Sequence, residues 1–236
     1  MTNGSPSPGT FPPTERTRIR RDDRAHYDRE VVYAVFDEAL ICHVGFVVDG
    51  QPYVMPTIHS RVGDTLYLHG SPATRMMRTV KRGAPVCITA TLLDGLVLAK
   101  SAFHHSMNYR SAVVIGAGRE ITDPDEKMVA MRAVVEHVAR GRWDEARQPN
   151  EKEFKGTAIV AIPIDEASAK VRTGPPIEDD DDLALEVWAG VLPLRTIPGR
   201  PEPSPDVTVG TPVPPSVDRW SRSSRRQNPK PGTAVT

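Results

Sequence analysis

The stretch ALICHVGFVVDGQPYVMPTIHSRVGDTLYLHG, residues 39–70, decides the fold. It contains three apolar runs rich in Val, Ile, Leu and Tyr, which are typical of β-strands. Asp49-Gly50 separates the first two runs and Gly63-Asp64 separates the second and third, and both dipeptides predict tight turns. Strands joined by such short turns pair antiparallel. The stretch therefore predicts a three-stranded meander, with Pro56 marking an edge position or an irregularity in its second strand.

Further strands and a few short helices surround this meander. Asp28 predicts the start of a short amphipathic helix, and Ser71-Pro72 predicts a second helix that ends at Gly83. Asp123 begins a third, longer helix. The remaining strands are expected at residues 84–95, 96–103, 108–123, 157–165, 167–173 and 185–194, with Asp94-Gly95 as the hairpin turn between the first two. About eight strands with interspersed short helices indicate a mainly β protein with a closed or nearly closed antiparallel barrel.

Composition divides the chain into three parts. Residues 1–15 offer little to bury and predict a disordered leader, residues 16–196 form the folded domain, and residues 197–236 form a disordered Pro/Arg-rich tail. The 30 basic and 30 acidic residues balance, and the excess of arginine lies in the tail. A neutral chain with a mildly acidic core is not built as a general nucleic-acid binder. We read the tail as a solvated extension; a weak contact of Arg222, Arg225 and Arg226 with a polyanion is the alternative.

The expected compartment is the cytoplasm. Cys42 and Cys87 each lie in an apolar run, which indicates buried free thiols in a reducing environment. Residues 1–14 have no apolar centre of the kind found in signal peptides, and no apolar stretch approaches membrane-spanning length. We therefore expect no contact with a membrane.

Common catalytic and metal-binding motifs are missing from the sequence. The seven histidines include no HExxH pair, and there is no GxSxG motif and no P-loop. His104 and His105 are adjacent, so in a strand they would point to opposite faces and would not readily share one metal ion. Residues 116–120, GAGRE, lack the full dinucleotide-binding fingerprint and predict a strand irregularity. No metal site is expected.

Residues 67–75, YLHGSPATR, run from a strand through Gly70 into the start of a helix. The free backbone N–H groups and the dipole at a helix start favour an anion. Ser71 and Thr74 offer hydroxyl donors, and Arg75 offers a planar cationic group suited to phosphate. The segment therefore predicts a site for a phosphate-bearing cofactor; an ordinarily capped helix with a surface arginine is the equal alternative.

Two other features could belong to a site. Residues 101–111, SAFHHSMNYRS, gather many hydrogen-bonding side chains where one strand crosses to the next, which indicates a site or a subunit contact rather than a plain loop. Trp188 lies in the last predicted strand. Packing in the core is its commonest use, and stacking on a cofactor ring is the sharper alternative.

Four stretches carry a resemblance to a known family. They are HVGFVVDGQPYVMPT (residues 43–57), LYLHGSPATRMMR (66–78), LDGLVLAKSAFHHSMNYRSAVVIG (93–116), and SAKVRTGPP with VWAGVLPL (168–176 and 187–194). In this order they resemble the pyridoxamine 5′-phosphate oxidase-like superfamily, and within it the nitroimidazole-resistance (Nim-like) flavin-nucleotide-binding branch. The resemblance covers residues 16–194. It implies a split β-barrel and a homodimer, with FMN in clefts between the subunits.

The resemblance also implies roles for individual residues. The implied cofactor-binding residues are Pro56, Thr57, Leu68, Gly70, Ser71, Thr74, Arg75, Asn108, Tyr109, Arg110, Ser111 and Trp188. Ser71, Thr74 and Arg75 would hold the FMN phosphate. His69 is the implied catalytic residue, a proton donor or orienting group beside the substrate, with a structural strand histidine as the alternative. The oxidases proper have Ser-Arg-Lys where this chain has Thr74-Arg75-Met76, so one cationic contact is missing.

The implied function is an FMN-dependent oxidoreductase acting on an unknown small molecule, for example a nitro compound. The alternative is a protein that binds a flavin, a deazaflavin or haem without turnover, because His69, His104 and His105 offer imidazoles as axial ligands. A third hypothesis is a regulatory protein that reaches a partner through its basic tail. Oxidation of vitamin B6 is not expected, because the arginine-rich end that reads pyridoxal phosphate has no clean equivalent beyond Arg195.

Overall fold

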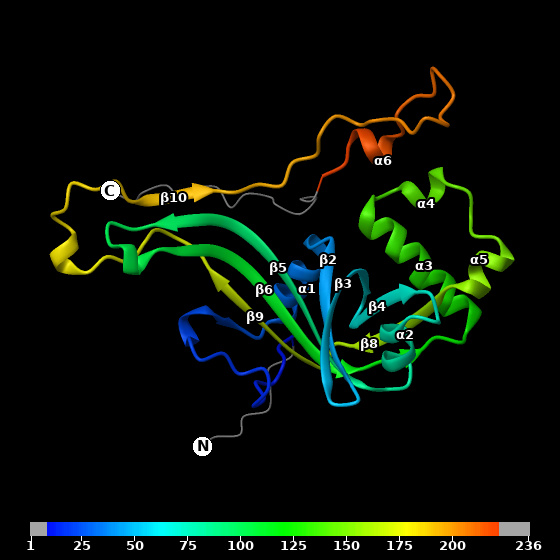
Figure 1. Cartoon of the computed structure of the whole chain (residues 1–236), viewed down its shortest axis with the longest axis horizontal. Coiled ribbons are helices and arrows are strands. Elements are labelled where there is room, and N and C mark those ends of the chain that lie inside the picture. The colour runs from blue at the N-terminus through cyan, green and yellow to red at the C-terminus, as the bar shows by residue number, and fades with distance from the viewer. Residues whose placement is uncertain (1–8, 222–236) are drawn as a thin grey trace.

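The computed structural model describes residues 9–221, which form a curled antiparallel sheet with most of the helices gathered at one end (Figure 1). The order of the strands is β1-β9-β6-β5-β2-β3-β4-β8-β7, and β10 pairs with β5. The strands are β1 (Ala25–His26), β2 (Ile41–Val48), β3 (Gln51–Val62), β4 (Thr65–Gly70), β5 (Pro85–Leu98), β6 (Ser106–Ala117), β7 (Arg119–Glu120), β8 (Ala158–Pro163), β9 (Glu166–Arg172) and β10 (Gly190–Pro193). The curled antiparallel sheet confirms the predicted barrel class, and the neighbouring β2, β3 and β4 confirm the predicted meander.

Six α-helices and three 3-10 turns complete the described residues. They are α1 (Arg29–Glu38), α2 (Arg75–Val80), α3 (Pro124–Val138), α4 (Arg142–Glu145), α5 (Glu151–Gly156), α6 (Pro215–Asp218), η1 (Asp22–Arg24), η2 (Ala102–His104) and η3 (Asp180–Asp182). The predicted helix starts at Asp28 and Asp123 are confirmed, and the Asp123 side chain accepts a hydrogen bond from the Glu126 backbone. No described helix has the length and apolar character needed to cross a membrane.

Pro56 lies within β3, opposite His43 of β2. The pairing of β3 with β4 covers only residues 59–62, so at Pro56 the far side of β3 carries no ladder. The missing N–H of proline therefore costs no inter-strand hydrogen bond there. The predicted local edge position is confirmed.

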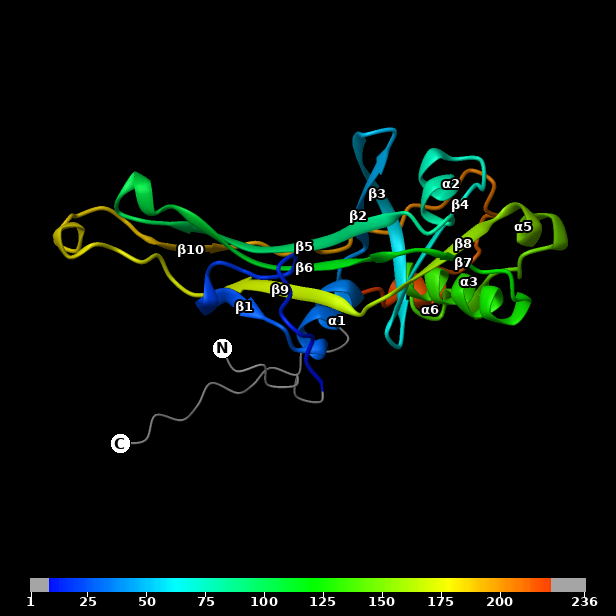
Figure 2. The same cartoon turned by 90° about the horizontal axis from the view of Figure 1, so that it is seen from below.

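β5 and β6 extend beyond the barrel as an arm, together with β9 and β10 (Figures 1 and 2). The prediction of a hairpin turn at Asp94-Gly95 is wrong: β5 runs on to Leu98, and the chain reverses around η2. Leu93 pairs with Tyr109 and Gly95 with Asn108, so Asp94 is the extra residue of a β-bulge. Glycine relieves a close approach at position 95, because a Cβ there would lie 3.0 Å from Val191 and 3.1 Å from the Leu192 carbonyl oxygen of β10.

Tertiary contacts explain why Asp94 does not turn the chain. Its carboxylate accepts from Nε and Nη2 of Arg110 at 2.8 and 2.7 Å, and its carbonyl accepts from the Leu194 backbone. Arg110 also donates to both carboxylate oxygens of Glu38, at the end of α1, at 2.5 and 2.9 Å. Together the two carboxylates raise the pKa of Arg110 above its ordinary value. The bulge thus places one arginine between two carboxylates and ties α1 to the arm.

β4 separates two apolar layers. Leu66 and Leu68 are fully buried in the main core, which α1 and the inner faces of β2, β5 and β6 complete. Tyr67 points to the other side, where it packs with Ala130 of α3 and Ile159 of β8 in a second, smaller cluster. β4 is paired on both edges, with β3 and β8, so its pleat assigns alternate side chains to opposite layers. His69 therefore lies on the side of α3.

The short break between β6 and β7 confirms the irregularity predicted for residues 116–120. A Cβ at Gly118 would lie 2.6 Å from side-chain or backbone atoms of Val80 and Val160. Glycine is required here because α2 and β8 approach the backbone closely.

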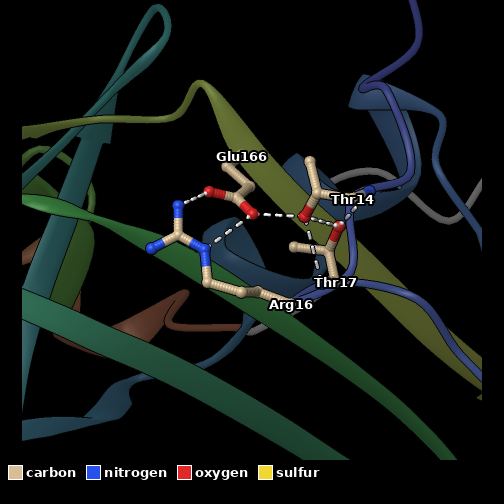
Figure 3. Close-up of polar contacts among 4 residues, drawn as sticks. All are labelled: Thr14, Arg16, Thr17 and Glu166. Atoms are coloured by element: carbon tan, nitrogen blue, oxygen red, sulfur yellow. Dashed lines mark hydrogen bonds and ion pairs between the residues drawn. The ribbon is translucent and has the colours of Figure 1, made fainter.

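Both ends of the folded part are longer than predicted. Phe11 is buried beside Tyr33, so the packing begins before residue 16. The N-terminal segment is fastened to β9 by Glu166, which accepts from the Thr14 hydroxyl and pairs with Arg16 (Figure 3). At the other end, α6 lies against α4 and α3: Ser216 donates to Glu145, and the Trp220 indole donates to the Val138 carbonyl at 2.7 Å.

The remaining predictions for the two ends, including the contact of Arg222, Arg225 and Arg226 with a polyanion, lie outside the described residues. Both cysteines are free, as expected. Cys42 is buried, but Cys87 is exposed on the outer face of β5, so the prediction of two buried thiols is wrong for Cys87. Its place in an apolar run reflects the pleat, which turns alternate β5 residues outward.

His59 is a fully buried histidine between α1 and α3. One ring nitrogen, Nε2, lies 2.8 Å from the Phe36 carbonyl, and Nδ1 has no hydrogen-bond partner within residues 9–221. The ring of His137 lies 4.7 Å away, centroid to centroid. Burial, reinforced by His137, lowers the pKa of His59 to about 4. His59 is therefore neutral near pH 7 and donates from Nε2.

We expect the free energy of unfolding to fall as the pH drops from about 6.5 to about 4, because the unfolded chain takes up a proton on His59 that the folded chain excludes. This residue alone accounts for roughly 3 kcal/mol of the loss. Urea unfolding between pH 4 and 7.5 measures it. His59→Gln keeps a donor for Phe36 and should show a flatter profile, whereas His43→Gln on the exposed face of β2 should not. Parallel profiles for the wild type and His59→Gln would contradict the assignment.

Replacing Arg110 with alanine should lower the free energy of unfolding by roughly 2–3 kcal/mol, because Glu38 and Asp94 would then face each other without their cation. Arg119→Ala, which breaks a more exposed pair with Glu126, should cost less than about 1 kcal/mol. Chemical denaturation of the cofactor-free protein gives both values. Equal costs for the two variants would show that the Arg110 network does not hold the arm.

Candidate functional site

A pocket of about 300 Å³ lies between β4 and the helices α3, α4 and α5. This volume is at the low end of the range for small-molecule sites. The lining residues are His69, Met131, Val134, Val135, Trp143, Ala146, Arg147, Pro149, Glu153 and Thr157. Six of them are apolar, one is an imidazole, and Arg147 and Glu153 carry charge. The pocket therefore combines an apolar wall with very few polar groups, which is typical of a site for an organic ligand.

His69 is the polar group on the β4 side of the pocket. It pairs with Ile159 in the sheet and is half-buried. Its Nδ1 is buried, and neither ring nitrogen has a hydrogen-bond partner among the described residues. Burial lowers the pKa of His69 below its ordinary value, so the ring is neutral near pH 7. A buried ring nitrogen without a partner is unfavourable unless a ligand supplies one.

Hydrogen bonds hold the opposite wall in place. Glu136 of α3 accepts from the backbone N–H groups of Gly141 and Trp143, at 2.7 and 3.0 Å, which fixes the turn from α3 into α4. The Gln148 side chain donates to the Trp143 carbonyl at 3.0 Å. The segment that carries Trp143, Ala146 and Arg147 is therefore shaped before any ligand arrives.

The exposed side of the pocket carries an ion pair. Arg147 donates to both carboxylate oxygens of Glu153, at 2.9 and 2.8 Å, and also to the Gln148 carbonyl. Glu153 accepts from the Asn150 backbone as well, as part of a capping box at the start of α5. Arg147 and these hydrogen bonds lower the pKa of Glu153 to about 2. The Arg147 side chain is 69% exposed, so the pair marks the mouth of the pocket.

The predicted phosphate segment directly follows His69. Ser71, Thr74 and Arg75 are all exposed, and the structure brings them together in one turn. The predicted cap is wrong: α2 begins at Arg75 with Thr74 as its N-cap, because Ser71 instead forms the preceding turn by accepting from Thr74 and Ala73. The Arg75 guanidinium lies over the Tyr53 ring at 4.4 Å and pairs with no carboxylate among the described residues. The Thr74 hydroxyl donates to the Ser71 carbonyl and accepts from the Met77 backbone, so this exposed segment offers the Arg75 guanidinium and the Ser71 hydroxyl as donors.

The outer face of the sheet gathers some of the predicted residues. Pairing aligns Pro56 with His43, His43 with Thr89, and Thr91 with Ser111. Because directly opposed residues point to the same side, Pro56, Ser111 and Tyr109 share this outer face. Thr57 has the opposite parity and pairs with buried Cys42. The face also exposes large apolar side chains, among them Ile41, Val47, Val54 and Leu93.

Two of the predicted cofactor-binding residues make internal contacts. Arg110 is held between Glu38 and Asp94, as described above. The Asn108 side chain is buried, donates to the Gly174 carbonyl at 3.0 Å, and accepts from Arg172 at 2.5 Å. Strand alternation turns both residues away from the outer face that carries Tyr109 and Ser111. The run of four residues is therefore divided between two sides of the sheet.

The other predicted residues lie elsewhere. Leu68 is fully buried in the main core, and Gly70 lies against Met77 of α2. Trp188 was expected in a strand, but β10 begins only at Gly190, and the indole is 67% exposed on the arm. His104 and His105 lie at the tip of the arm, at the opposite end of the molecule from the pocket (Figure 1). Of the three histidines considered for haem, His69 is the one that lines the pocket between β4 and α3.

Trp143, Arg147 and Glu153 line the pocket but were not predicted as site residues. They come from a polar link that pairs with no strand, and only the fold brings them opposite His69. The capping box formed by Asn150 and Glu153 was a readable signal for the helix that positions them, but not for the pocket.

Comparison with known proteins identifies relatives of this chain. The family profile described as pyridoxamine 5′-phosphate oxidase matches residues 28–171. The structure of the flavocytochrome Anf3 from Azotobacter vinelandii is similar at 38% identity with a TM-score of 0.83, over 89% of this chain and 99% of that one. The FAD and heme binding protein from Mycobacterium smegmatis is also 38% identical, with a TM-score of 0.80 over 83% and 96% of the two chains.

A 5-nitroimidazole antibiotic resistance protein from Bacteroides thetaiotaomicron is 27% identical, with a TM-score of 0.54 over 62% of this chain and 86% of that one. A search of curated proteins finds no match. The family match spans more than half of the chain, and the sheet has the split-barrel form of these relatives. The chain therefore belongs to the pyridoxamine 5′-phosphate oxidase family, as its motifs indicated.

Proposed function

We propose that the protein is a redox protein that binds a flavin nucleotide at residues 71–75 and haem in the pocket beneath α3, with His69 as the iron ligand. One observation carries the proposal: a half-buried, neutral imidazole, for which the described part of the chain provides no hydrogen-bond partner, faces an apolar pocket. Two relatives at 38% identity support it, one named a flavocytochrome and the other an FAD and heme binding protein.

The pocket residues fit haem by their chemistry. Neutral imidazole is a common axial ligand of haem iron, and the lowered pKa keeps His69 in that form at neutral pH. The same shift disfavours the role of proton donor, which needs the imidazolium. Met131, Val134, Val135 and Trp143 would cover the ring and keep water from the iron. The pocket opens at Arg147 and Glu153, so part of the ring can project beyond the wall.

The flavin is proposed for the exposed turn after β4. The Ser71 hydroxyl and the Arg75 guanidinium offer donors to a phosphate, while the Thr74 hydroxyl holds the turn by donating to the Ser71 carbonyl. Arg75 pairs with no carboxylate among the described residues, so binding a phosphate breaks no ion pair. FMN is the nucleotide that the family resemblance implies, and FAD is the one named for a relative. Both present a phosphate to this turn. Met76 leaves the site one cation short of the oxidases, so phosphate affinity depends on Arg75.

A homodimer is proposed through the outer face of β2, β3, β5 and β6. This face exposes Ile41, Val47, Val54 and Leu93 beside Pro56, Tyr109 and Ser111. An apolar face of this kind on a soluble domain marks an association surface. A second copy seated on it would cover the flavin ring between two sheets.

When bound, the two cofactors would supply one- and two-electron redox chemistry. The chain supplies position and environment. His69 and Ser71 are separated by a single glycine, so β4 places the iron ligand and the phosphate turn next to each other. The substrate is a small molecule or a partner cofactor that exchanges electrons at the outer face.

Removing the imidazole should abolish haem binding. The purified protein titrated with haem should develop a Soret band, and His69→Ala should weaken the affinity by more than about 100-fold, since even loss of a metal ligand's supporting partner costs about 10–100-fold. His105→Ala, at the exposed arm tip, is the control and should bind like the wild type. Unchanged spectra and affinity in His69→Ala would sink the haem assignment.

Arg75→Ala should lower flavin affinity by about tenfold, because it removes the only guanidinium of the phosphate turn. Arg78→Ala, one turn further along α2, should have little effect. Fluorescence titration with FMN and with FAD gives both affinities and decides between the nucleotides. Equal losses of flavin affinity in Arg75→Ala and Arg78→Ala would contradict the role of Arg75.

Sedimentation of the protein should show a dimer. A monomer that binds flavin with undiminished affinity would contradict a flavin site shared between two subunits.

A further inference from the structure

The pocket is polar at its two ends and apolar between them. His69 lies on the strand side, Met131, Val134, Val135 and Trp143 form the walls, and Arg147 with Glu153 occupies the mouth. A ligand that fits all three parts has a centre that binds an imidazole nitrogen, an apolar body and an anionic edge. We propose that Arg147 breaks its ion pair with Glu153 and binds a carboxylate of the pocket's ligand instead. This inference rests on the proposed haem function and assigns Arg147 to a propionate group.

Arg147 can exchange Glu153 for a ligand carboxylate at little cost in free energy, because the existing ion pair is exposed. The side chains of Arg147 and Glu153 are 69% and 46% accessible, and such exposed pairs contribute little to stability. A carboxylate anchored in the pocket by the rest of its molecule has already lost its translational freedom. It therefore competes well with a side chain for the same two N–H donors.

Glu153 keeps other hydrogen bonds when Arg147 leaves it. Its Oε2 accepts from the Asn150 backbone at 2.8 Å, and its own backbone N–H donates to the Asn150 side chain at 2.9 Å. These hydrogen bonds of the capping box remain when Arg147 turns away, so the carboxylate stays solvated and bonded. The start of α5, which borders the mouth, keeps its shape through the exchange.

A backbone contact keeps the Arg147 side chain at the mouth of the pocket. Its Nη1 also donates to the Gln148 carbonyl at 2.9 Å, and Gln148 is held by the Trp143 carbonyl at 3.0 Å. The guanidinium is therefore kept at the rim by the same turn that presents Trp143 to the pocket. An anion at Arg147 and an iron at His69 would together fix which edge of the ring faces outward.

The test compares haem with its dimethyl ester, which has the same iron and ring but no carboxylate. Arg147→Ala should weaken haem binding by about tenfold, the value of one charge-assisted hydrogen-bonded contact at a partly exposed site, and change binding of the dimethyl ester by less than about twofold. Glu153→Gln keeps the capping box and frees Arg147, so it should strengthen haem binding by about threefold and leave the ester unaffected.

Lys155→Ala is the matched control: it removes one cation from α5, but Lys155 pairs with Glu151 and does not line the pocket. It should bind both compounds like the wild type. Equal loss of haem and ester in Arg147→Ala, or equal loss of haem in Lys155→Ala, would overturn the proposal, since the effect would then be structural or a general charge effect. A wild type that binds neither compound would remove the proposed haem function itself. Binding of both compounds with equal affinity by all four proteins would leave that function standing and overturn only the role of Arg147.

Discussion

Everything at the candidate site depends on the pleat of β4. The strand is paired on both edges, with β3 and β8, so it cannot rotate about its axis, and its side chains alternate strictly between two layers. Leu66 and Leu68 are committed to the main core, and this commitment turns Tyr67 and His69 toward α3. A slip by one residue would turn the imidazole into the main core and move the two leucines to the side of α3. The large apolar core therefore determines the direction of one polar side chain.

The same constraint explains how much could be predicted from the sequence. The meander and the helix beginning at Asp123 follow from local patterns: turn dipeptides, cap residues and apolar runs. Asp94-Gly95 has an equally strong turn pattern, yet it forms a bulge, because Arg110, Glu38 and β10 contact it from positions far away in sequence. Local propensity was overridden by tertiary contacts that no window of sequence contains.

The predicted site residues show a similar division. Asn108, Tyr109, Arg110 and Ser111 form one sequence motif, but the strand turns them alternately to two sides, and only Tyr109 and Ser111 share the outer face with Pro56. Arg110 instead ties α1 to the arm. Arg147 belongs to no motif, and the capping box at Glu153 indicates a helix start but no pocket, because both residues line the pocket only through the way the turn after α4 faces β4. A motif identifies a strand of interest, while the pleat and the facing element decide which of its residues can reach a ligand.

The central claim is that His69 is a desolvated imidazole without a partner, held ready for a ligand. Its pKa in the cofactor-free protein, followed by NMR of the histidine ring, tests this claim most directly. The account predicts a pKa below the ordinary value of about 6.5 and a resonance that stops titrating when zinc protoporphyrin IX, a diamagnetic haem analogue, is added. A pKa at or above about 6.5, or a titration that the porphyrin leaves unchanged, would contradict it.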